Sequence, residues 1–135
     1  MRPFRHTMLL AVLSAALSTG AASMNSHTLL GTTDDPRIKA CGINVQGTDW
    51  AEFSPFIQTA ADFSGSFEIA VIKTSRSGTS QTRQANRIQA GVFAGTQIRL
   101  DRPASVALQM KVMDETGKLV CHLAETIELH AAINL

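Results

Sequence analysis

The chain has 135 residues, which is enough for one domain and too few for two. It is 44% hydrophobic and 17% charged, with a formal net charge of +1. These values exclude a strongly basic nucleic-acid binder and a low-hydrophobicity disordered chain.

Residues 1–22 have the pattern of a cleaved export signal. Arg2, Arg5 and His6 form a basic start, Met8 to Leu17 is apolar, and small residues follow. A bilayer span needs about 20 apolar residues, so we expect no stable membrane insertion. No cysteine directly follows the signal, which argues against a lipid anchor.

The charge of the mature chain is unevenly distributed. Without Arg2 and Arg5, ten basic residues face eleven acidic ones. Residues 73–102 hold six of the basic residues and only one acidic residue, Asp101. A basic middle is therefore flanked by acidic ends, and we expect no nucleic-acid partner.

After the signal, residues 23–36 contain turn and cap residues without a period, so we predict a flexible leader. The domain is predicted over residues 37–135, where the pattern is that of β-strands. Cys41, Ile43 and Val45 share one face of the first strand.

The next apolar run contains Pro55, which belongs at a sheet edge or a bulge. The run that follows places Phe67, Ile69 and Val71 on one face and is the best candidate for a buried strand. The runs after residue 85 are shorter and broken by glycine and proline.

The last third of the chain predicts a β-hairpin. Apolar residues alternate on both sides of a turn at residues 114–117. They are Val106, Leu108, Met110, Val112, Leu119, Cys121, Leu123, Ile127 and Leu129.

About seven short antiparallel strands, with a turn signal roughly every ten residues, indicate an all-β fold. We predict a small Ig-like β-sandwich. It is Ig-like in layout only, because Trp50 follows Cys41 too closely for the antibody-type spacing of cysteine and tryptophan.

The strand pattern points both Cys41 and Cys121 toward the core. In an exported protein a disulfide is the first expectation for such a pair. Two buried thiols and a redox-active pair are the alternatives, and the absence of a CxxC spacing argues against the redox pair.

Residues that could support catalysis are scattered. His27, His122 and His130 have no neighbouring nucleophile in the sequence pattern, and the two pairs of adjacent carboxylates fit turns. No metal-ligand spacing and no nucleotide-binding motif occurs. We expect a protein that is not an enzyme and needs no cofactor and no metal.

The run SRSGTSQTRQANR, residues 75–87, holds three arginines, no acidic residue and no large apolar side chain. Within it, Ser77 to Gln84 resembles the Ser-Gly-x-Ser-Gln-Thr-(Lys/Arg)-Gln stretch of the periplasmic curli amyloid-inhibitor family, the CsgC/CsgH type. The preceding FEIAVIKTSR and the later HLAETIEL also resemble that family's strands. Some members have a Cys-x-Cys pair where this chain has Phe63 to Gly65, so it looks closer to the CsgH branch and a thiol role is less expected.

The resemblance implies a monomeric periplasmic protein that keeps a secreted amyloid fibre subunit, of the curli major subunit type, from polymerising. The partner-binding surface would then be the polar stretch, where hydroxyls, amides and guanidinium groups can contact an acidic partner. Its predicted members are Arg76, Ser77, Thr79, Ser80, Gln81, Thr82, Arg83, Gln84 and Arg87.

Other readings of the same sequence stay open. Ser77 to Gln84 can be a strand-turn-strand with a solvated face and no partner. The whole protein can be a minor fibre or adhesin subunit, a thiol-redox protein that uses Cys41 and Cys121, or an inhibitor of a periplasmic enzyme.

Overall fold

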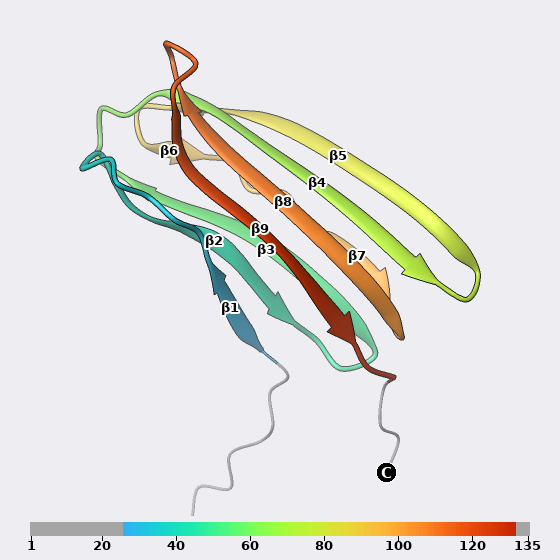
Figure 1. Ribbon diagram of the computed structural model, residues 1–135. Helices are drawn as coiled ribbons and strands as arrows, with labels where there is room; N and C mark the ends of the chain where they lie inside the picture. Colours follow the sequence, from blue (N-terminus) through green and yellow to red (C-terminus); the bar gives the residue numbers. More distant parts are fainter. Residues whose placement is uncertain (1–25, 132–135) are drawn as a thin grey trace, which may run out of the picture.

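Two antiparallel sheets face each other in the computed structural model, which describes residues 26–131 (Figure 1). The four-stranded sheet has the order β1-β2-β3-β7 and the five-stranded sheet the order β6-β5-β4-β8-β9. The strands are β1 His27–Leu30, β2 Ile38–Gln46, β3 Trp50–Thr59, β4 Gly65–Ser75, β5 Gly78–Gln89, β6 Val92–Phe93, β7 Ile98–Asp101, β8 Ala104–Asp114 and β9 Leu119–Leu129. The predicted all-β sandwich is confirmed, with nine strands instead of about seven. The predicted signal, residues 1–22, lies outside the described residues.

The core lies between the sheets and is filled by alternate residues of each strand. The predicted inward faces are confirmed for β2 and β4, since Ile43, Val45, Phe67 and Ile69 are all buried. Phe67 also packs edge-on against Phe93 of β6, with 4.8 Å between ring centroids. The largest fully buried side chains are Phe53, Phe67, Ile43, Ile69, Ile88 and Met110.

The proline in β3 lies where the sequence places it, beside an open edge. Strand β7 pairs with β3 only from Trp50 to Phe53. Pro55 lies beyond this pairing and faces Ile43 of β2 on its other side. The missing N–H of proline is tolerated where no further strand needs it.

No strand is predicted before residue 37, and the structure corrects this. Strand β1 pairs with β2, from His27 opposite Val45 to Leu30 opposite Gly42. Thr32 then crosses to the other sheet, where it exchanges backbone hydrogen bonds of 2.8 and 3.1 Å with His122 of β9. A four-residue strand is too short to show a period, and its partners come from distant parts of the chain.

A second correction concerns Leu119, which is predicted to face inward with Cys121. Leu119 is 44% exposed and Val120 is buried instead. The pairing of β8 with β9 shifts register between Val112 and Met113, so the alternation of β9 is interrupted at its start. Such a bulge leaves no signal in the apolar pattern of β9.

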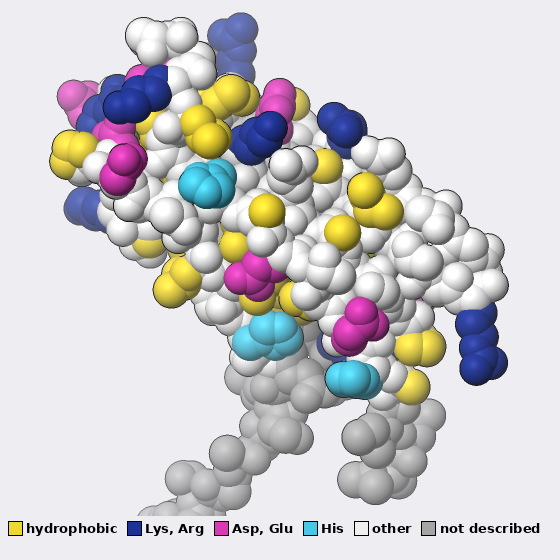
Figure 2. All heavy atoms as spheres, in the orientation of Figure 1, with side chains coloured by type: hydrophobic (Ala, Val, Ile, Leu, Met, Phe, Trp, Pro, Cys, Tyr) yellow, Lys and Arg dark blue, Asp and Glu magenta, His cyan; other side chains and the backbone are white. Residues whose placement is uncertain are grey.

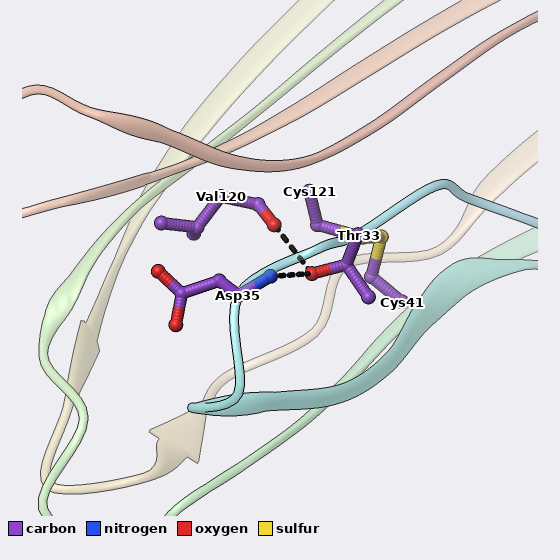
Figure 3. Close-up of a disulfide and its surroundings, with 5 residues drawn as sticks. All are labelled: Thr33, Asp35, Cys41, Val120 and Cys121. Atoms are coloured by element: carbon purple, nitrogen blue, oxygen red, sulfur yellow. Dashed lines mark hydrogen bonds between the residues drawn. A yellow bond between two sulfur atoms is a disulfide. The ribbon is translucent and has the colours of Figure 1, made fainter.

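The predicted pair of cysteines forms a disulfide between the sheets (Figure 3). Cys41 of β2 and Cys121 of β9 are 80 residues apart in sequence, and their Cα atoms are 6.5 Å apart. Beside them, the Thr33 hydroxyl donates a 2.7 Å hydrogen bond to the Val120 carbonyl and accepts one of 3.2 Å from the Asp35 amide. The crossing segment and the disulfide thus close the same side of the sandwich.

A cluster of ion pairs joins the segment between β1 and β2 to the turn between β8 and β9. The Arg37 guanidinium donates to Asp35 at 2.8 Å and to Asp114 at 2.9 Å. The hydrogen bonds from Arg37 lower the pKa of Asp35 from 3.8 to about 2. The pKa of Asp114 is also well below its usual value, first because the Thr116 hydroxyl donates to it and then because Arg37 does. Both carboxylates are therefore held in the charged form.

Candidate partner-binding surface

The polar stretch of the sequence forms one hairpin turn and most of β5. Ser75 pairs with Gly78, so Arg76 and Ser77 form a two-residue turn. Gly78 has a φ of 124°, a conformation that glycine adopts without the clash a Cβ would cause. In Figure 1 this turn is the far tip of the long β4–β5 hairpin.

The pairing of β5 with β4 divides the predicted residues between two faces. Arg83 lies opposite Ala70, and Gln84 lies opposite the buried Ile69. Odd-numbered residues of β5 therefore share the solvent face of the sheet, while even-numbered residues share the core side. The solvent face receives Thr79, Gln81, Arg83 and Arg87, and the core side receives Ser80, Thr82 and Gln84.

The residues of the predicted surface thus lie along one strand and its turn, and only some of their side chains are exposed. Thr82 and Gln84 are half-buried, and the Oε1 atom of Gln84 is buried without a hydrogen-bond partner. The remaining predicted residues are exposed. The local structure is therefore a strand, a turn and a strand with a solvated face. Whether this face can bind a partner depends on the side chains and charges that β5 exposes.

The three arginines of the β4–β5 hairpin form no ion pair with another described residue. Within residues 26–131, the basic side chains of Lys73 and Arg99 lie near carboxylates, at 3.7 Å from Asp101 and 3.8 Å from Glu52. No such pair is found there for the three arginines of the hairpin, Arg76, Arg83 and Arg87. Unpaired cations on an exposed strand can attract an acidic partner, within the 8–10 Å over which physiological salt leaves charges unscreened.

Sequence reasoning missed a shallow hollow next to Arg83 on the solvent face of the sheet. The small side chains of Ala70 and Ala85 leave room for this hollow, and its volume is about 260 Å³. Lys111 of β8 and Glu68 of β4 stand at its rim. Figure 2 shows mostly backbone and uncharged side chains over β4 and β5, with separate basic side chains. The outward alternation of β4 and β8 is a signal that could have found these residues.

The remaining candidates for chemistry stay apart. The histidines are exposed: His27 begins β1, His122 lies in β9 and His130 directly follows β9. In the described part of the chain, no group of three His, Cys, Asp or Glu side chains could hold a metal ion. No helix of residues 26–131 is long and apolar enough to cross a membrane.

The fold and this surface describe a small β-sandwich with an exposed polar, basic strand. Searches found no matching family model and no matching curated protein. Among solved structures, the chain is similar to the solution structure of CsgH from R. palustris, with 20% identity, 67% of this chain and 89% of that chain covered, and a TM-score of 0.45. This similarity is distant, and the function proposed below is drawn from the chain's own residues.

Proposed function

We propose that this protein is a periplasmic, chaperone-like inhibitor of amyloid polymerisation that binds a secreted, curli-type fibre subunit transiently and without a cofactor. One observation carries the proposal. The stretch Ser77 to Gln84, which resembles the curli amyloid-inhibitor family, runs from the hairpin turn into β5, whose arginines have no ion-pair partner within residues 26–131.

The physical properties of this strand suit such a role. Hydroxyl and amide side chains can replace the hydrogen bonds that a polar, unfolded subunit makes with water. The charges of Arg83 and Arg87 discourage one copy of the inhibitor from pairing with another along the same edge. None of the exposed large apolar side chains of residues 26–131 belongs to β5, which favours a brief contact over tight apolar binding.

The disulfide agrees with an oxidising compartment such as the periplasm. Both sulfur-bearing residues are only 1% exposed, which argues against thiol exchange as the working chemistry. The fibre-subunit alternative needs a free N-terminal donor strand, and His27 to Leu30 are already paired in β1. Cell fractionation separates the two, because a fibre subunit is found outside the cell.

The test is a fibrillation time course of a purified curli major subunit, followed by thioflavin fluorescence. The protein without residues 1–22 is added at substoichiometric ratios, and an unrelated Ig-like domain serves as a control. A longer lag with this protein alone supports the proposal. An unchanged lag, with the protein shown to be folded and disulfide-bonded, overturns it.

A charge-matched pair of variants locates the surface. Replacing Arg76, Arg83 and Arg87 with serine should shorten the lag toward that of the subunit alone while the melting temperature changes little. The matched control replaces Lys39, Arg99 and Lys118 with serine. These are exposed basic residues elsewhere on the protein, so the control removes the same charge. Equal effects of the two triple variants would show that net charge matters and that β5 does not.

A further inference from the structure

Strand β5 has a long edge that no other described strand covers. The five-stranded sheet ends in β6, which pairs only with Ile88 and Gln89. From Thr79 to Arg87, the side of β5 opposite β4 has no paired strand within residues 26–131. In Figure 1 this edge runs along the outside of the molecule.

Two hairpin turns fix which backbone groups this edge presents. In a two-residue hairpin the residues that flank the turn face each other through their hydrogen-bonding groups. The turn at residues 76–77 is flanked by Ser75 and Gly78, so even-numbered residues of β5 bond to β4. The turn at residues 90–91 is flanked by Gln89 and Val92, so odd-numbered residues face away from β4. Both turns give the same answer: the N–H and C=O groups of Thr79, Gln81, Arg83, Ala85 and Arg87 point outward.

The other open edges of the sandwich are less suited to pairing with an added strand. The open part of β3 contains Pro55, which has no N–H to donate. Strand β1 has only four residues. The edge of β9 is engaged by Thr32 at His122, and its remaining length carries glutamates instead of arginines.

We propose that the β5 edge binds an extended segment of its partner by adding it as a further strand of the five-stranded sheet. This inference rests on the proposed function and specifies how the subunit is held. Main-chain hydrogen bonds supply the affinity, and alternate side chains supply the selection. Pairing also occupies one edge of the subunit's strand and places the sandwich where the next subunit would add.

The side chains along the edge define the chemistry of the segment that fits. Arg83 and Arg87 point to the same face four residues apart, which is about 13 Å along a strand. Acidic side chains at the same spacing in the partner can meet both guanidinium groups. Between the arginines, the small Ala85 borders the hollow over Ala70, so a larger side chain fits there. The partner is therefore an extended acidic segment with one bulky residue between its two carboxylates.

Amide hydrogen exchange read residue by residue tests this mode in the unaltered protein. In the free protein, the amides of the even-numbered residues from Ser80 to Asn86 should exchange slowly, because they bond to β4. The odd-numbered amides from Thr79 to Arg87 should exchange fast. Addition of monomeric curli major subunit should slow the odd-numbered amides by about tenfold or more. The inference is overturned if the subunit slows exchange at other amides and leaves the odd-numbered amides of β5 unchanged. It is also overturned if exchange of the odd-numbered amides slows only with the concentration of the inhibitor, because that indicates pairing between its own copies.

A proline variant tests the same edge by function. Ala85→Pro removes an outward N–H and obstructs an added strand, yet it keeps every charge and every bond to β4. Its matched control, Ala85→Thr, keeps the N–H. We expect the proline variant to lose most of the extension of the thioflavin lag and the threonine variant to keep it, with both folded by circular dichroism.

The outcomes separate the two proposals. A wild-type protein that does not lengthen the lag removes the proposed function, whatever the variants do. A wild-type protein that lengthens the lag, with a folded Ala85→Pro variant of equal potency, leaves the function standing and overturns strand addition at β5. Should the proline variant not fold, the exchange measurement on the wild-type protein decides.

Discussion

Removal of the disulfide is the most quantitative perturbation that the structure offers. The double variant Cys41→Ala, Cys121→Ala removes the disulfide between the sheets and leaves two small, buried side chains in its place. The backbone bonds between Thr32 and His122 still join the same two parts of the fold. We therefore expect the variant to fold and to lose stability.

The loss can be estimated from the length of the loop that the bridge closes. For cysteines 80 residues apart, the chain-entropy model gives about 4.5 kcal/mol of stabilisation. Measured losses on removal of native disulfides run from about 2 to 5 kcal/mol. A domain of this size has about 5–15 kcal/mol in total, so a loss of about 4.5 kcal/mol removes roughly a third of the free energy of unfolding or more.

Urea denaturation followed by circular dichroism measures this difference. The wild-type protein treated with a reducing agent in denaturant is the control, because it loses the bridge without a substitution. A loss below about 1 kcal/mol in both would refute the reasoning from loop length. The folded double variant should still lengthen the thioflavin lag, and loss of inhibition by a folded variant would favour the thiol-redox alternative.

Two further predictions concern the closed side of the sandwich. The pKa of Asp35 is lowered from 3.8 to about 2 and that of Asp114 is lowered as well, so the unfolded chain takes up protons first as the pH falls. The stability that these carboxylates contribute is complete above about pH 4 and is lost as the pH falls toward 2, and a melting temperature that is flat from pH 5 to 2 would contradict this. Gly31→Ala places a Cβ against the Cys41 sulfur and the His122 carbonyl. We expect a loss of about 1–3 kcal/mol in urea, and a fully stable variant would show that the crossing segment can move away.

Much of the fold follows from alternation in the sequence. From Cys41 to Val45 of β2, and along most of β4 and β8, every second residue is apolar, and the structure buries these residues. Because side chains of a strand alternate between faces, the pattern also pointed Cys41 and Cys121 into the core. The polar stretch was visible as an interruption of that pattern.

The pattern failed where an element is short or its alternation breaks. Strand β1 gains its hydrogen bonds from β2 and not from its own sequence, and Thr32 gains a partner 90 positions away. The bulge near Val112 buries Val120 and exposes Leu119, the reverse of the prediction for Leu119, and this depends on how β9 aligns with β8. The ion pairs of Arg37 likewise join segments far apart in the chain.

The sequence by itself determined that this chain is a β-protein with two inward cysteines and one conspicuous basic, polar strand, because these are local properties of residue type and period. Only the tertiary structure decided that this strand stands at the edge of its sheet. Strand order depends on which distant segments pair. In the described part of the chain, the pairing leaves the outward backbone groups of β5 from Thr79 to Arg87 without a neighbouring strand.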